Sequence, residues 1–400
     1  MLRFSLSLWL CLIGTSLPLL AQTETPAPNP LETPLKSPLL PAIDRPLTPL
    51  EHRQLLLYIE QRDAEAQAKY DAGLNEEAFP IWYEVIKLNR YLGAKEEVKS
   101  LGKVGLAAWN RDRTEDVKLI TARLKTVQQT AETNRTMDEE LLALLGTSYQ
   151  QVRAFNEAII IYDKILATAR KSGDNVAVEA TLNQLGQIHL SRFDYQKAAP
   201  VYEELLTISK AQNNSLTQGI YLQRLAEIYR ESLQPANAVK IKEEIAETQI
   251  RNQQIQLIPD LKIQIGLDYQ ALKDANKASQ NFQEAYSLAF ALQQYGTAGE
   301  ALSKLAELYK SYQQVDYALQ IYQELIKIHE LGYNYYGLMN TYDQIGQIYL
   351  ERKNYRQALL AFQKGAELAQ AIRYREQYFQ TQITQINQAI NNPVHRSLSI

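Results

Sequence analysis

The chain has 400 residues, of which 46% are hydrophobic and 22% charged, so it is long enough to bury a large core. Its 42 Lys and Arg residues nearly balance 45 Asp and Glu residues, which gives a formal net charge of −3. A nucleic-acid-binding surface needs clustered Lys and Arg side chains to neutralise phosphates, and the sequence has no long basic run. The composition therefore argues against a nucleic-acid partner.

Residues 1–21 have the layout of a secretory signal peptide. Arg3 precedes an apolar run over residues 4–20, and Ala21 ends the segment before a polar stretch. We expect export to the periplasm or another extracytoplasmic space, with cleavage after Ala21 favoured over retention as a membrane anchor. No membrane insertion is expected after cleavage.

The single cysteine, Cys11, lies inside this segment behind the bulky Trp9 and Leu10, which do not resemble a lipoprotein signal. Cleavage would leave a mature chain without any cysteine, and so without disulfides or thiolate metal ligands. We therefore expect packing alone to stabilise the fold.

Residues 22–50 are rich in proline and predict an extended, semi-rigid linker. They contain eight of the fourteen prolines of the chain, at Pro26, Pro28, Pro30, Pro34, Pro38, Pro41, Pro46 and Pro49. From about residue 51 onward prolines become rare and apolar residues recur at intervals of three and four, the helical period.

Four features then repeat every forty residues. A small residue recurs at Gly146, Gly186, Ala226, Gly266, Ala306 and Gly346. Three positions later stands a ring, at Tyr149, His189, Tyr229, Tyr269, Tyr309 and Tyr349, and twelve positions later an alanine, at Ala158, Ala198, Ala238, Ala278, Ala318 and Ala358. Sixteen positions later the residues are Tyr162, Tyr202, Lys242, Phe282, Tyr322 and Phe362. Each unit is predicted to be a helix pair, and pairs must stack because one pair cannot bury its apolar stripe alone.

The order of residues in LGQIHL…KAAPVY and IGQIYL…QALLAF resembles the tetratricopeptide repeat, in the forty-residue, long-helix variety of kinesin light chains and spindle-orientation adaptors. The resemblance implies an all-α fold: a right-handed superhelical solenoid of stacked antiparallel helix pairs. It also implies that the two helices of a pair, A and B, approach closely at the small residues. A concave groove lined by helix A would then bind a protein or peptide partner without catalysis.

The remaining boundaries follow from this register. Residues 138–375 are predicted to form six regular units, residues 376–392 a Gln-rich capping helix, and residues 393–400 a flexible tail. Residues 51–137 are predicted to form degenerate N-terminal helix pairs. In the first of them Ala66, Ala78 and Trp82 fall in register. In the second, Trp109 takes the ring position, Leu106 replaces the small residue, and Gly105 lies one place before it.

No pattern in the sequence indicates an enzyme, a metal site or a cofactor site. There is no phosphate-binding Gly-rich loop, no H-E-x-x-H and no Gly-flanked serine elbow. His189 stands at a ring position filled elsewhere by Tyr, so it is interpreted as a packed core residue.

Helix geometry, at 100° per residue, shows which helix A positions point away from the core. In the family that the sequence resembles, such positions line the concave groove, and the resemblance therefore implies which side chains face a partner. Two units carry matching basic-acidic-basic stripes, and the units beside them carry amides. The predicted groove residues are Asn183, Gln187, Gln223, Arg224, Glu227, Arg230, Ser303, Lys304, Glu307, Lys310, Asp343 and Gln347. The simpler interpretation is that the charged pairs only support their own helices.

The sequence thus predicts an exported, non-catalytic scaffold that assembles a protein or peptide partner of unknown identity. One alternative is a structural component of the cell envelope that self-associates through its ends or through Tyr333, Tyr335 and Tyr336 in one inter-repeat turn. Those three rings are interpreted as staples between neighbouring helices in preference to a binding patch. The other alternative is a ligand-sensing helical protein, which would need a deep pocket with convergent titratable groups.

Overall fold

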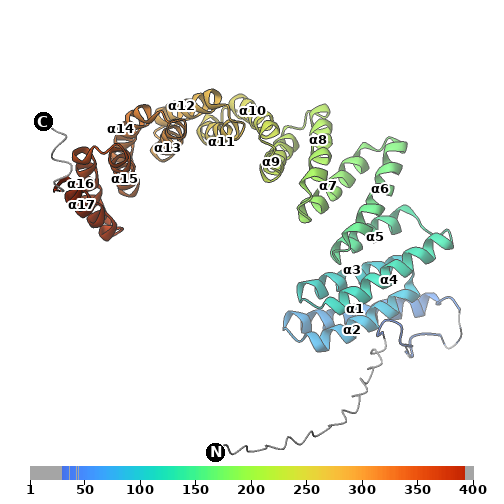
Figure 1. The fold of residues 1–400 in the computed structure, drawn as a ribbon. Coiled ribbons are helices and arrows are strands. Elements are labelled where there is room, and N and C mark those ends of the chain that lie inside the picture. Colours follow the sequence, from blue (N-terminus) through green and yellow to red (C-terminus); the bar gives the residue numbers. More distant parts are fainter. Residues whose placement is uncertain (1–28, 36, 42, 44, 392–400) are drawn as a thin grey trace, which may run out of the picture. The chain divides into compact units, whose positions relative to one another are not determined.

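The computed structural model describes residues 29–35, 37–41, 43 and 45–391, and its regular secondary structure over these residues consists of helices alone (Figure 1). The all-α fold class and the stack of helix pairs are confirmed. The predicted signal peptide, the start of the linker and the C-terminal tail lie outside the described residues. Within the described part of the chain, no helix is both long and apolar enough to cross a membrane.

The chain divides into two compact parts, up to Ile165 and from Leu166 onward, and each is described by itself. The first part contains α1 (Pro49–Asp71), α2 (Asn75–Asn89), the short η1 (Arg90–Leu92), α3 (Ala94–Asn110), α4 (Thr114–Thr133), α5 (Glu139–Gln151) and most of α6 (Phe155–Ser172). The second part contains α7 (Asn175–Ser191), α8 (Tyr195–Ala211), α9 (Ser215–Glu231), α10 (Pro235–Arg251), η2 (Ile255–Leu257), α11 (Ile258–Ala271), α12 (Ala275–Ala291), α13 (Tyr295–Ser311), α14 (Val315–Leu331), α15 (Tyr335–Glu351), α16 (Tyr355–Ile372) and α17 (Glu376–Asn391).

The turns have a period of twenty residues, half of the sequence repeat. A left-handed residue, with φ between 52° and 72°, recurs at Arg153, Gly173, Phe193, Asn213, Leu233, Gln253, Lys273, Gln293, Gln313, Tyr333, Lys353 and Arg373. The next backbone N–H then bonds five residues back, as from Asp194 to the His189 carbonyl, which closes the helix end. Several of the following helices begin with an Asp or Asn side chain that accepts a backbone N–H of the first turn.

The small residues of the repeat lie against the residues sixteen positions later. A Cβ added to Gly186 would come within 2.9 Å of the Tyr202 ring, and one added to Gly266 within 2.5 Å of Phe282. The alanines twelve positions later, from Ala158 to Ala358, have no exposed surface. Glycine therefore has a packing role inside these helices that offsets its low helix propensity.

His189, the one ring position without Tyr, is 7% exposed, as expected of a core residue.

The segment before α1 differs from the extended linker that its prolines predict. Leu31 is fully buried, and Leu35, Leu39, Leu40 and Leu47 pack on a cluster formed by Leu55, Ile59, Val85 and Leu88 of α1 and α2. Lys87 Nζ also lies 3.1 Å from Thr33 Oγ1. The leucines between the prolines explain the difference, because they cover the apolar surface of the first helix pair.

The second N-terminal pair consists of α3 and α4, and the register predicted for α3 is wrong. Trp109, predicted at a buried ring position, is 46% exposed, and Leu106 is exposed as well. A Cβ on Gly105 would meet Val152 and Ile120, so Gly105 takes the small position one residue earlier than predicted. Buried Ala108 then stands where the other units have a ring.

Candidate functional site

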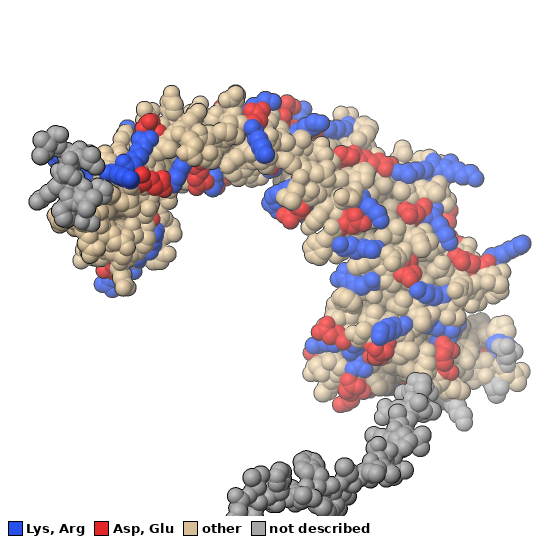
Figure 2. Space-filling model, in the orientation of Figure 1, with Lys and Arg blue, Asp and Glu red and all other residues tan. Residues whose placement is uncertain are grey.

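The predicted stripe of α9 is exposed, that of α13 is exposed at Glu307 and partly exposed at Lys304 and Lys310, and both are partly paired within their helices. Arg224 Nη1 lies 3.0 Å from Glu227 Oε2, and Lys304 Nζ lies 3.1 Å from Glu307 Oε2. Arg230 instead pairs with Glu231, at 2.8 Å. The face in Figure 2 shows Lys and Arg interspersed with Asp and Glu along the described surface, without an extended patch of one sign.

Each stripe borders a cleft, and the two clefts lie eighty residues apart in the repeat register. The α9–α11 cleft, of about 400 Å³, is formed by helices α9, α10 and α11, and the α13–α15 cleft, of about 530 Å³, by α13, α14 and α15. Equivalent lining residues are Glu227 and Glu307, Lys242 and Tyr322, Ile245 and Leu325, Gln249 and His329, Asp260 and Asn340, and Gln264 and Gln344. The two clefts therefore occupy equivalent places in the repeat but are lined by different side chains.

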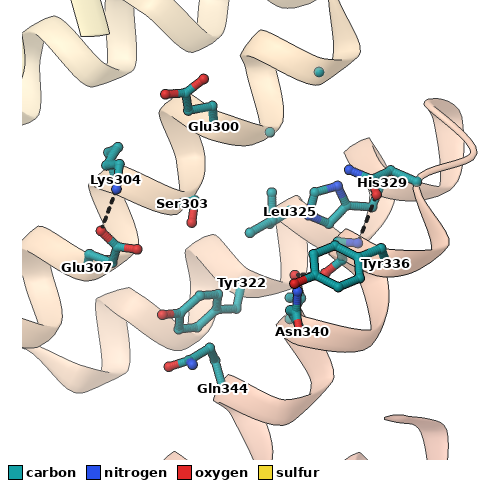
Figure 3. A pocket seen from close by; sticks show the side chains of 15 residues that line it. Glu300, Ser303, Lys304, Glu307, Tyr322, Leu325, His329, Tyr336, Asn340 and Gln344 are labelled. Atoms are coloured by element: carbon teal, nitrogen blue, oxygen red, sulfur yellow. Dashed lines mark hydrogen bonds and ion pairs between the residues drawn. The ribbon is translucent and has the colours of Figure 1, made fainter. Parts of the chain in front are cut away.

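The α13–α15 cleft is lined by side chains from three helices (Figure 3). Glu300, Ser303, Lys304 and Glu307 come from α13, Tyr322, Leu325 and His329 from α14, and Tyr336, Asn340 and Gln344 from α15. Glycines at 299 and 337 make room for the imidazole, because a Cβ at either would lie 3.2 Å or 2.5 Å from His329 Cε1.

Two titratable groups of this cleft are held neutral by their surroundings. Burial, followed by the negative charge of Glu307, raises the pKa of Tyr322 to about 12. Burial lowers the pKa of His329 below its usual value. At neutral pH both side chains therefore offer hydrogen bonds without charge.

The α9–α11 cleft has an ion pair in its wall. Lys242 replaces the ring found in the other units, and its Nζ lies 2.7 Å from Asp268 Oδ2. Arg230 and Glu227 line the same cleft, so its cations and carboxylates are close to balance. The single break in the ring pattern is thus accommodated by a charged partner on the next helix.

Two predicted groove residues contact α17 or the turn before it: Asp343 is buried, which corrects its assignment, and Gln347 is partly exposed. The carboxylate of Asp343 is 8% exposed and accepts hydrogen bonds from Arg375 at 3.0 Å and from the Tyr378 hydroxyl at 2.8 Å. Gln347 Nε2 donates to the same Tyr378 hydroxyl at 2.9 Å. The turn before α17 and α17 itself therefore occupy the positions that a partner would need.

The other predicted residues are distributed along the helix A surface. Gln187 and Gln223 are exposed, Asn183 donates to the Tyr221 hydroxyl at 3.0 Å, and Lys310 Nζ lies 3.5 Å from Gln344 Oε1. The register names helix A alone, so it misses the helix B contribution, here Tyr322 and His329.

The tyrosines of the α14–α15 turn are exposed. Tyr333, Tyr335 and Tyr336 are 78%, 53% and 55% exposed, and the Tyr336 ring centroid lies 5.7 Å from that of Tyr374. Tyr336 thus contacts a neighbouring helix end and also lines the cleft.

Among the described residues, no group of three or more His, Cys, Asp or Glu side chains is arranged to hold a metal ion. The clefts offer carboxylates, amides, hydroxyls and rings, which suit reversible binding.

Comparisons with known proteins identify the repeat. Residues 138–211 and residues 340–372 match family models of the tetratricopeptide repeat. These matches cover the first two of the six regular pairs and most of the last. No curated protein matches the chain.

Several solved structures are similar to parts of the chain. BtubC from P. vanneervenii has 17% identity, covering 55% of this chain and 92% of that one, with a TM-score of 0.38. MamA has 19% identity, covering 48% and 92%, with a TM-score of 0.35. The apo form of RapI has 14% identity, covering 84% and 99%, with a TM-score of 0.37.

Proposed function

Because the chain is a tetratricopeptide-repeat protein, we propose that it is a non-catalytic scaffold that binds a protein or peptide partner through the helix A surface of its second part. The observation that carries the proposal is the pair of equivalent open clefts beside the charged side chains of α9 and α13. Side chains of an extended segment that enter both clefts would be held two repeats apart.

The chemistry of the surface supports reversible recognition. Glu227, Arg230 and Glu307 are exposed residues of the cleft linings, both clefts carry amides, and the α13–α15 cleft also carries rings. Polar rims around partly apolar pockets are typical of surfaces that bind other proteins transiently.

Export to an extracytoplasmic space belongs to the same proposal and rests on residues 1–21. Fractionation of the source cells, with N-terminal sequencing of the mature protein, tests it. A mature chain that begins at Gln22 in the envelope fraction supports export, and an intact chain in the cytosol contradicts it.

Partner capture tests the binding surface. The double variant Arg230→Glu with Lys310→Glu reverses two charges beside the two clefts and is expected to abolish capture of the partner from envelope extracts. The matched control is Lys240→Glu with Lys364→Glu, since both lysines are exposed on helices α10 and α16. Equal capture by both doubles, with helicity unchanged in circular dichroism, would rule out this surface.

A further inference from the structure

We propose that the α13–α15 cleft binds a basic side chain, Arg or Lys, of an extended partner segment. The inference rests on the proposed function and names what one part of that surface recognises. Three features of the cleft carry it: an excess carboxylate, exposed and buried rings, and neutral acceptors.

The cleft lining has one carboxylate more than it has cations. Glu300 and Glu307 lie on α13 with Lys304 between them, and Lys304 pairs with Glu307 at 3.1 Å. No described residue forms an ion pair or hydrogen bond with the carboxylate of Glu300, which is exposed at the rim. His329 adds no positive charge at neutral pH, so the lining residues themselves carry a net negative charge. Lys310 is not part of the lining, but its Nζ lies 3.5 Å from Gln344 Oε1, so the carboxylate left for an incoming cation is that of Glu300.

Aromatic rings lie on two sides of the same space. The Tyr336 ring is 55% exposed and rests against Tyr374, and the buried Tyr322 lines the cleft from α14 (Figure 3). A cation over the face of a tyrosine ring is attracted by its quadrupole, and more strongly where water is partly excluded. The rings therefore suit a guanidinium or ammonium group with an apolar stem.

Neutral oxygen atoms complete the set. Ser303, Asn340 and Gln344 line the cleft. The amide oxygens of Asn340 and Gln344 each accept one contact already, from Arg375 and Lys310, and each has a second lone pair for an N–H group of a guanidinium. Arg375 already donates to Asn340 at 3.3 Å, but Asp343 neutralises it at 3.0 Å. Arg375 consequently leaves the net charge of the cleft unchanged.

The α9–α11 cleft is an internal control with the same backbone and different side chains. Eighty residues before Glu300, Tyr322 and Tyr336 stand Ile220, Lys242 and Gln256. That cleft therefore lacks both rings and the carboxylate at the Glu300 position. It has Asp260 where the other cleft has Asn340, and its two carboxylates, Glu227 and Asp260, are matched by the cations Arg230 and Lys242. We expect it to show no preference for a basic side chain.

The test uses the purified full chain and three blocked peptides, Gly-Ser-X-Ser-Gly, in which X is arginine, citrulline or glutamate. Citrulline has the shape of arginine without its charge. Backbone NMR signals of Gly296 and Gly299 report the α13–α15 cleft, and the methyl signals of Ile245 report the α9–α11 cleft. The arginine peptide is expected to shift Gly296 and Gly299 and to bind about tenfold more tightly there than citrulline does.

Two variants test the residues. Glu300→Gln is expected to weaken binding of the arginine peptide about tenfold, and Tyr336→Ala is expected to weaken it as well. The control Glu247→Gln, on the exposed surface of α10 and outside the lining of both clefts, should leave the affinity unchanged. Equal binding of citrulline, an unchanged affinity in Glu300→Gln, or no shift of Gly296 and Gly299 would overturn the proposal.

The outcomes also separate this inference from the proposed function. If the glutamate peptide shifts the cleft signals instead, the surface still binds peptides and only the basic preference is wrong. If no peptide shifts them and the Arg230→Glu, Lys310→Glu double still captures the partner, the binding surface itself is wrong.

Discussion

Lys242 and Asp268 form a buried ion pair between α10 and α11, with 2.7 Å between Nζ and Oδ2 and side-chain exposures of 5% and 14%. Lys242 stands where the other units have a ring. Asp268 is the only charged residue at its repeat position, where the other units have Ser148, Ile188, Ile228, Leu308 and Ile348. The two exceptions in the sequence are thus one interaction in the structure.

This pairing predicts a strong dependence of each partner on the other. Lys242→Met leaves the Asp268 carboxylate buried without a cation and is expected to lower the free energy of unfolding by about 3–5 kcal/mol. The double variant Lys242→Phe with Asp268→Ile restores the residues of the other units and is expected to match or exceed the wild type. Urea denaturation followed by circular dichroism measures both, and a double variant as unstable as the single one would contradict the pairing.

The buried alanines of the repeat predict that a larger side chain at the same position lowers the stability of the fold. Ala198 has no exposed surface, so Ala198→Trp forces a large ring between α7 and α8 and is expected to cost about 1–3 kcal/mol or more. Lys197→Trp, one residue earlier and exposed, is the matched control and should melt like the wild type. Equal melting of the two variants would show that the register is wrong.

The forty-residue register was predictable because small residues and rings contact each other within one pair, as Gly186 and Tyr202 do. The contacts of Asp343 and Gln347 with Tyr378 could not be predicted in this way. They depend on how α17 packs, and α17 lies after the last repeat, so the repeat pattern gives no information about its position. The sequence also places Gly105 one residue before the expected small position, but it does not decide between Gly105 and Leu106. The contacts of Gly105 with Ile120 and Val152 decide for Gly105, and this single displacement moves the whole face of the helix.

The packed N-terminal segment predicts that its leucines stabilise the first helix pairs. Leu31 is fully buried, so Leu31→Ala is expected to lower the free energy of unfolding by about 2–5 kcal/mol. Ile43 lies in the same segment and is 71% exposed, so Ile43→Ala should have little effect. Thermal melts of the two variants distinguish this packing from an unattached linker, for which both would melt like the wild type.

The left-handed residue that recurs in the turns every twenty residues predicts a stabilising substitution. Leu233 has φ 54° and is 86% exposed, so its side chain contributes little packing while its Cβ disfavours the left-handed backbone. Leu233→Gly is expected to raise the free energy of unfolding by about 0.5–1 kcal/mol. The reciprocal change, Gly173→Ala, at φ 72°, should destabilise the protein. A lower melting temperature for Leu233→Gly would contradict the conformational argument.

Buried tyrosines predict alkaline unfolding. Burial raises the pKa of Tyr322 to about 12. Burial is also the main reason why the pKa values of Tyr83, Tyr149 and Tyr229 are raised. A phenol ionises near pH 10 in an unfolded chain, so these raised pKa values favour folding below pH 10. The stabilisation from Tyr322 is lost as the pH rises from about 10 to about 12, because the unfolded chain then releases a proton that the folded chain retains. Parallel ultraviolet and circular dichroism titrations should therefore show a fraction of the phenolates appearing together with the loss of helix. In urea all tyrosines should ionise near pH 10, and a native titration identical to that in urea would contradict the burial of these rings.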